Sequence, residues 1–142
     1  MIQEKLDKEV DVIEKSEIEK GSRIEKEIEK TNHTPEEKEA LKLGYDAVSV
    51  DITKRDKAGY MPEVKNITLK LIADRRSHKI LGAQAIGCGD ADKRVNTVSV
   101  GLLQGITVEE LIDVDLTYAP PFSTSIDILI SAAQILKTKL LG

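Results

Sequence analysis

The chain has 142 residues, a formal net charge of −4 at pH 7 and a sequence pI near 5.3, which suit one compact domain with an appendage. The weakly acidic balance and 3 % aromatic content argue against nucleic-acid binding. One cysteine excludes an intramolecular disulfide framework, and two histidines leave little for a zinc or haem centre, so we expect no metal site.

The first thirty residues differ in composition from the rest of the chain. They hold 10 acidic and 7 basic residues, with apolar residues at Ile2, Leu6, Val10 and Ile13. This spacing predicts a charged helical extension over residues 1–30 with one narrow apolar stripe. Such a stripe cannot hold a helix alone in water, so we expect it to dock, to pair with another chain or to fray. A hairpin at Gly21-Ser22 and partial disorder remain alternatives.

Residues 31–44 carry clear helix signals. Thr34 is placed to cap a helix, Pro35 suits its first position, and Glu37 completes a capping box. Gly44 reads as the stop.

Three strands and two helices are predicted next. Apolar residues alternate with polar ones over 45–53 and over 67–71, and a third strand over 79–86 follows the short turn 74–78, antiparallel to the second. A helix is expected over 91–103. Thr107 and Glu110 form a capping box that opens a short helix ending near Ile112, and residues 114–122 are expected to be extended.

The closing helix, predicted over 126–140 with Ser123 or Ser125 as its cap, is apolar around most of its axis. An exposed helix needs a polar half, so this one needs apolar cover on more than one side. We expect the sheet to cover one side and a second copy of the chain another; complete burial within one chain is the alternative. No apolar run approaches the roughly 20 residues that span a bilayer, and the first residues are charged from Glu4 onward, so a cytoplasmic location is expected.

Several stretches of this order are similar to one known family. They are Thr34–Tyr45, Ala58–Pro62, Leu69–Asp74, Ile80–Gln84, Lys93-Arg94, Gly105–Leu111 and, most specifically, Tyr118-Ala-Pro-Pro-Phe-Ser123. From residue 31 onward the chain resembles the C-terminal dimerisation domain of the pyridine nucleotide–disulfide oxidoreductases, in the branch of NADH oxidases and coenzyme A–disulfide reductases. The resemblance implies a domain over 31–142 with an α+β fold, an antiparallel sheet flanked by helices, and a homodimer.

The resemblance also implies candidate site residues. In the coenzyme A–disulfide reductase branch two tyrosines assist at the partner's flavin site, and they match Tyr60 and Tyr118. A phenol can donate a hydrogen bond to a thiolate. Together with the apolar closing helix, the resemblance predicts a dimer interface of Tyr118, Pro120, Pro121, Phe122, Ile126, Leu129, Ile130, Ala133 and Leu136.

The chain departs from the full-length family enzymes in one important way. It contains no Gly-x-Gly-x-x-Gly turn, so we expect neither FAD nor NAD(P)H to bind to this chain and no catalysis by it alone. Gly87-Cys88-Gly89-Asp90 suggests an anion cradle only weakly, because Asp90 and Asp92 already serve the helix start; Cys88 is expected to be an unreactive turn residue.

Three functions remain open from the sequence. The first is a stand-alone dimerisation or interaction domain, freestanding rather than cut from a longer chain. The second is a subunit that completes the active site of a separate flavoprotein in trans through Tyr60 and Tyr118. The third is a module that keeps a groove for coenzyme A or a nucleotide between protomers.

Overall fold

The computed structural model describes residues 35–142, with side chains from residue 37 onward. The predicted extension over 1–30 and the predicted cap Thr34 lie outside the described residues. Contacts divide the chain into two units, residues 1–44 and 45–142, which are described separately. In the first, helix α2 (Pro35–Lys42) begins at the predicted proline. Gly44 has a φ of 88° and donates its N–H to the Leu41 carbonyl oxygen, which confirms the predicted glycine stop.

The second unit is built on a three-stranded antiparallel sheet in the order β1 (Ala47–Arg55), β2 (Asn66–Asp74) and β3 (Ile80–Gly87). All three predicted strands are present, although β1 begins and ends two residues later than predicted and β2 is longer at both ends. In the central strand Ile67, Leu69, Leu71 and Ala73 have no exposed surface. Burying a leucine or isoleucine side chain contributes roughly 1.5–3 kcal/mol, so this face of β2 is the main source of core stability.

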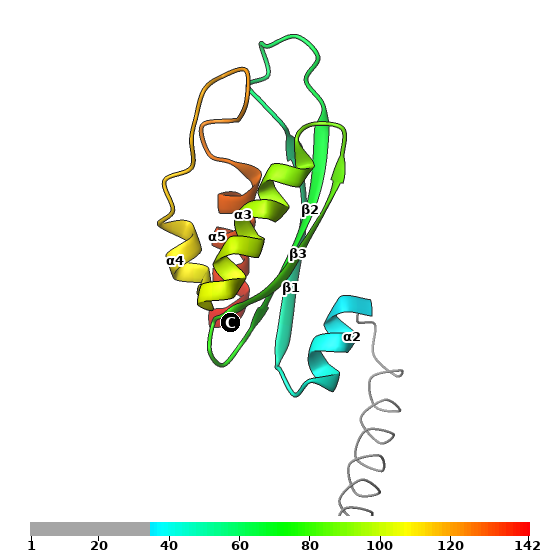
Figure 1. Ribbon diagram of the computed structural model, residues 1–142, viewed down its shortest axis with the longest axis vertical. Coiled ribbons are helices and arrows are strands. Elements are labelled where there is room, and N and C mark those ends of the chain that lie inside the picture. The colour runs from blue at the N-terminus through cyan, green and yellow to red at the C-terminus, as the bar shows by residue number, and fades with distance from the viewer. Residues whose placement is uncertain (1–34) are drawn as a thin grey trace, which may run out of the picture. The chain divides into compact units, whose positions relative to one another are not determined.

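Three helices lie on the same face of the sheet, as Figure 1 shows: α3 (Ala91–Gln104), α4 (Val108–Ile112) and α5 (Ile128–Leu141). Helix α3 packs along β3, whereas α5 packs against β1, β2 and α4. Val98 of α3, Leu111 of α4 and Leu129 of α5 join the residues of β2 in one core. The predicted α+β fold, an antiparallel sheet flanked by helices, is confirmed. No helix in the described part of the chain is long and apolar enough to cross a membrane.

Helix α4 has the predicted capping box. The Thr107 hydroxyl accepts from the Glu110 N–H, and the Glu110 carboxylate accepts from the Thr107 N–H at 2.8 Å. These two bonds satisfy backbone donors that every helix start leaves free. A helix of only five residues is thereby held in place, and it buries Val108 and Leu111.

Helix α5 corrects two expectations. It is capped by Asp127, whose carboxylate accepts from the Leu129 N–H, and not by Ser123 or Ser125. Its residues Leu129, Ala133 and Leu136 are fully buried by the chain's own sheet and by α4, so the expectation that one chain cannot cover them is wrong. The expectation failed because no local sequence pattern reports how much of a helix the sheet and α4 together cover. Only Ile130, Ile135 and Leu141 leave apolar surface uncovered along the helix.

Candidate functional site

Two loops meet at one end of the second unit. The first, residues 56–65, is closed by Asp56, whose N–H donates to the Lys65 carbonyl oxygen (2.8 Å) and whose carboxylate accepts from the Lys65 N–H (2.7 Å). Tyr60 lies within this loop and is 77 % exposed. The loop therefore has a fixed base and presents its tyrosine to solvent.

The second loop comprises residues 113–127 and joins α4 to α5. Residues 114–119 have no regular secondary structure, and the chain then turns where the Phe122 and Ser123 N–H groups both donate to the Ala119 carbonyl oxygen. The Ala58 N–H donates to the Pro120 carbonyl oxygen at 3.3 Å, so the two loops are in direct contact. We call residues 56–65 and 113–127 together the loop end; Figure 1 shows them at the top of the sheet.

Arg94 of α3 connects the parts of the loop end. It is 2 % exposed, and all three of its guanidinium nitrogens donate. Nη2 lies 2.7 Å from the Asp127 carboxylate and 3.1 Å from the Asp56 carbonyl oxygen. Nη1 donates to the Asp90 carbonyl oxygen (3.0 Å) and Nε donates to Asp127 (3.1 Å). The Arg94 side chain thus donates hydrogen bonds to the base of the first loop, to the turn before α3 and to the end of the second loop.

Asp127 is the acidic partner in this arrangement. Its carboxylate also accepts from the Ser123 hydroxyl at 2.9 Å and from the Leu129 N–H. Burial alone would raise its pKa, but the hydrogen bonds from Arg94, Leu129 and Ser123 and the charge of Arg94 together outweigh burial and hold the pKa of Asp127 below its usual value. The Asp127 carboxyl is therefore ionised at neutral pH, and each buried side-chain nitrogen or oxygen in the described part of the chain has a hydrogen-bond partner.

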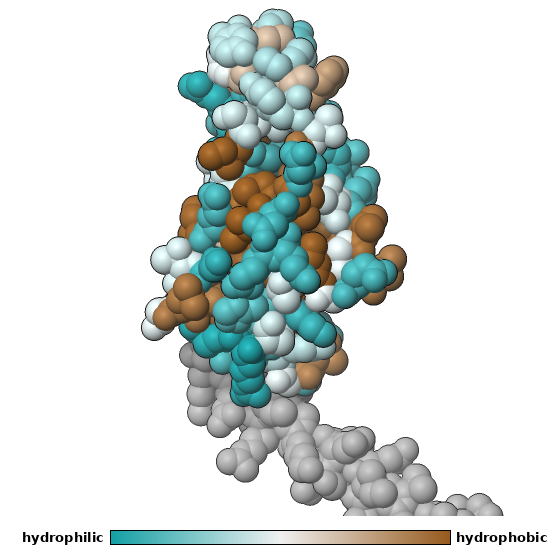
Figure 2. All heavy atoms as spheres, turned by 90° about the vertical axis from the view of Figure 1, so that its left-hand side faces the viewer, coloured by the Kyte–Doolittle hydropathy of each residue, from teal (hydrophilic) through white to brown (hydrophobic). Residues whose placement is uncertain are grey.

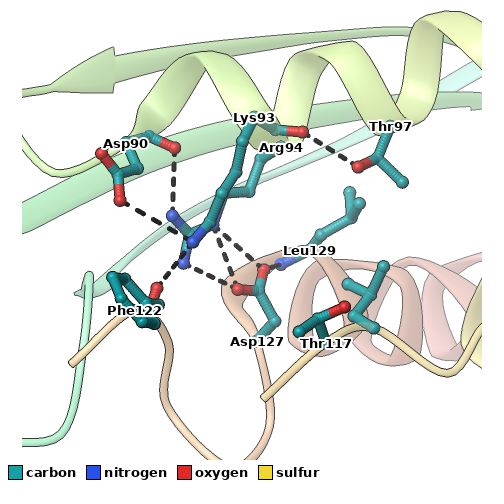
Figure 3. A pocket seen from close by; sticks show the side chains of 9 residues that line it. Asp90, Lys93, Arg94, Thr97, Thr117, Phe122, Asp127 and Leu129 are labelled. Atoms are coloured by element: carbon teal, nitrogen blue, oxygen red, sulfur yellow. Dashed lines mark hydrogen bonds and ion pairs between the residues drawn. The ribbon is translucent and has the colours of Figure 1, made fainter. Parts of the chain in front are cut away.

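A half-open pocket of about 500 Å³ lies beside this ion pair, between α3, the second loop and the start of α5. Figure 3 shows Lys93 and Arg94 reaching from α3 toward Phe122 and Asp127 along one wall. The Lys93 ammonium group donates to the Phe122 carbonyl oxygen at 2.7 Å. Thr97, Leu116, Thr117 and Leu129 complete the lining. The lining charges are two basic and two acidic, so the pocket has no net charge.

The turn before α3 is not shaped for a phosphate. Asp90 lies in the left-handed region (φ 51°) and makes no side-chain cap, which corrects the expectation that it serves as one. A Cβ atom on Gly89 would lie 2.4 Å from the Asp56 Cβ, so packing against Asp56 explains this glycine. The residues of this turn do not suit the pyrophosphate of a dinucleotide. Cys88 is a free, exposed thiol.

The structure separates the predicted interface residues into two groups. Tyr118, Phe122 and Ile126 are exposed by half or more, Pro121 is exposed, and Pro120 and Ile130 are half-buried. Leu129, Ala133 and Leu136 lie in the core and have no surface to offer a partner, so their assignment to the interface is corrected. Tyr60 and Tyr118 lie on two loops that are joined by a hydrogen bond, and both side chains are exposed.

Apolar side chains also gather on the face that carries α4 and the second loop, as Figure 2 shows in the middle of the view. Ile112, Val114 and Leu116 pack there against the core but stay partly exposed. At the opposite end of the sheet from residues 56–65, the His78 ring contacts the Glu109 carboxylate at 2.9 Å and joins the β2–β3 turn to α4. Burial would raise the pKa of Glu109, but the His78 hydrogen bond, a backbone N–H and nearby positive charge together outweigh burial and lower it.

The family model of the pyridine nucleotide-disulphide oxidoreductase dimerisation domain matches residues 34–129. The chain belongs to this family. Its sequence is 39 % identical over 111 residues to an NAD(P)H coenzyme A polysulfide/persulfide reductase of Pyrococcus horikoshii, covering 78 % of this chain and 24 % of the relative. It is 33 % identical over 85 residues to the coenzyme A disulfide reductase of Staphylococcus aureus, covering 60 % of this chain and 19 % of the relative.

Solved structures agree with this membership. An NAD-dependent persulfide reductase from A. fulgidus superposes with a TM-score of 0.71 at 36 % identity, over 75 % of this chain and 20 % of that one. A water-forming NADH oxidase from Lactobacillus brevis gives 0.68 at 26 % identity, over 72 % and 23 % of the two chains. The dimerisation domain described here therefore spans about a quarter or less of the length of these relatives.

Sequence patterns alone do not reveal the residues that hold the loop end together. Arg94 appears among them only within the stretch Lys93-Arg94, and no local pattern marks Asp56. Asp127 alone gave a usable signal, since an aspartate directly before an apolar run is a typical N-cap. The contacts of Arg94 join residues 38 and 33 positions apart, a separation at which local sequence patterns carry no information.

Proposed function

We propose that this dimerisation domain forms a homodimer through its loop end and serves as an interaction domain, without catalysing a reaction on its own. The observation that carries the proposal is the exposure of Tyr118, Phe122 and Ile126, three large apolar side chains within nine residues of one another. Exposed aromatic and aliphatic groups framed by polar residues are typical of protein contacts, and aromatic side chains dominate their energetics. The half-buried Ile130 borders the same surface.

Sedimentation at micromolar concentration tests this proposal. We expect the unaltered chain to dimerise and Phe122→Asp to raise the dissociation constant about tenfold or more, because a buried interface carboxylate has no partner. Leu103→Asp is the matched control. Leu103 is 84 % exposed on α3, outside the loop end, and its replacement should leave dimerisation unchanged. A chain that stays monomeric, or one split by Leu103→Asp and not by Phe122→Asp, contradicts the proposal.

The cofactors of the related reductases belong elsewhere under this proposal. The 142 residues contain no Gly-x-Gly-x-x-Gly sequence, and the glycine turn before α3 is filled by Asp56. We therefore propose that FAD and NAD(P)H bind to other domains, in a separate flavoprotein or in a longer chain, and that the domain acts in the cytoplasm.

A second function is favoured by the placement of the two tyrosines. Tyr60 and Tyr118 are both exposed and stand on loops joined by the Ala58–Pro120 hydrogen bond. Their phenols are free to hydrogen-bond a thiolate or a proton-accepting group on a partner flavoprotein, and would thereby complete its active site in trans.

Mixing with a reductase chain that holds only FAD- and NAD(P)H-binding domains tests the second function. We expect the mixture to reduce a coenzyme A disulfide or persulfide faster than the flavoprotein alone. Tyr118→Phe and Tyr60→Phe should remove much of this gain, whereas Tyr45→Phe, on a tyrosine outside the loop end, should keep it. No gain on mixing, or equal effects of all three replacements, would rule the second function out.

A further inference from the structure

Four of the buried polar residues in the described part of the chain gather at the loop end. They are Asp56, Arg94, Ser123 and Asp127, each with 7 % or less of its surface exposed. A buried ion pair gains little stability over well-packed apolar residues of the same volume, because both charges lose their hydration. Stability alone is therefore a poor explanation for a charged cluster at this place, and conformational specificity is a better one.

The bonds of Arg94 run to backbone as much as to its ion-pair partner. Its guanidinium donates to the carbonyl oxygens of Asp56, Gly89 and Asp90, at 3.0–3.3 Å. Asp56 is the residue that closes the first loop, and Gly89 packs directly on its side chain. The position of the first loop relative to α3 is thus set by one side chain.

The same guanidinium fixes the second loop. Asp127, held by Nε and Nη2, binds the Ser123 hydroxyl, and Ser123 lies directly after the exposed Phe122. The neighbouring Lys93 holds the Phe122 carbonyl oxygen itself. A planar group with donors on three sides is required for this arrangement, and a lysine at position 94 offers only a single point charge.

We propose that Arg94 is the positioning residue of the loop end: it presets the two loops so that Tyr60, Tyr118 and Phe122 are presented in a geometry ready for a partner. The part of this inference that concerns binding to a partner rests on the proposed function. The ordering of the loops does not, because it is a property of the single chain. Association costs free energy for every loop that must be ordered on binding, so preset loops bind more tightly than mobile ones.

Amide hydrogen exchange measured together with sedimentation tests the role of Arg94. In Arg94→Lys we expect the Ala58 and Lys65 amides, which donate across and within the loop end, to exchange about tenfold faster or more. The Ile80 amide, which donates to Ile106 away from the loop end, should keep its rate. The dimer dissociation constant should rise by about tenfold as well.

Val98→Ala is the matched control for a general loss of stability. Val98 lies one turn further along α3 and is buried in the core, and its aliphatic side chain makes none of the hydrogen bonds of the cluster. This variant should be less stable overall yet keep slow exchange at Ala58 and unchanged dimerisation. If Arg94→Lys does not fold, Gly89→Ala replaces it, because the added Cβ atom displaces Asp56; Gly82→Ala, with nothing within 4 Å of its added atom, is its control.

The outcomes separate the two proposals. A monomeric parent chain contradicts the proposed homodimer, and the exchange rates then decide the role of Arg94 alone. Equal exchange at Ala58 and Lys65 in the parent and in Arg94→Lys overturns the positioning role, whatever the oligomeric state. Faster loop exchange with an unchanged dissociation constant shows that the preset geometry does not serve dimerisation, and overturns the inference in that respect.

Discussion

At the scale of single residues, the Arg94–Asp127 pair is the most consequential contact of the dimerisation domain. The pair is buried and its nitrogen–oxygen distance is 2.7 Å. Removing one partner from such a pair leaves a buried charge without compensation, which costs more than the pair contributes when intact.

Asp127→Asn tests this contact without disturbing the helix cap. Asparagine caps a helix about as well as aspartate does, so the change isolates the loss of charge beside Arg94. We expect the free energy of unfolding to fall by about 3–5 kcal/mol in denaturant titrations. Asp92→Asn, an exposed acidic residue in the first turn of α3, should change it by less than about 0.5 kcal/mol. Equal losses in the two variants would contradict the role given to the pair.

The same carboxyl makes stability depend on acid pH. Its pKa in the folded chain lies below the ordinary value of 3.8, although burial opposes the effect of Arg94. The ionised Asp127 carboxylate therefore makes its full contribution to the free energy of unfolding above pH 3.8. This contribution is lost as the pH falls through the lower pKa that Asp127 has in the folded chain. The difference in unfolding free energy between the parent and Asp127→Asn should shrink on acidification, while Asp74, Glu109 and Glu110 titrate alike in both. A difference that grows toward low pH would contradict this.

At the scale of elements, local sequence patterns predicted the features that depend on hydrogen bonds between residues close together in the chain. The Thr107–Glu110 capping box, the three alternating strands and the glycine stop of α2 all depend on residues a few positions apart, and all are confirmed. The cap of α5 was assigned to the wrong residue, because Ser123, Ser125 and Asp127 all satisfy the same local rule. The extent of α5 burial and the Arg94 contacts depend on elements far apart in the sequence, and no local pattern reports them.

Thr107→Ala measures what the capping box contributes to α4. Loss of the hydroxyl acceptor should lower the free energy of unfolding by about 0.5–2 kcal/mol, because a five-residue helix has few other bonds and carries two core residues. Thr138→Ala is the control: its hydroxyl bonds only the Gln134 carbonyl oxygen within α5, and its replacement should be nearly neutral. A larger loss from Thr138→Ala in thermal or denaturant unfolding would show that the box contributes little.

At the scale of the whole molecule, the structure changes the reason for expecting a dimer. The sequence placed that reason in the closing helix, but the chain buries most of α5 itself. Among the exposed apolar side chains are Tyr118, Phe122 and Ile126 of the second loop, which the sequence analysis also assigned to the interface. The proposed homodimer agrees with membership in a family of dimerisation domains, and the proposal places its interface at the loop end.

The most direct test of this account is an isotope-filtered NMR experiment on a mixture of labelled and unlabelled copies of the chain, which detects contacts only between copies. We predict such contacts from the side chains of Phe122 and Ile126 and none from the exposed Val100 and Leu103 of α3. Contacts confined to Val100 and Leu103, or no contacts between copies, would contradict the claim that the loop end is where two copies meet.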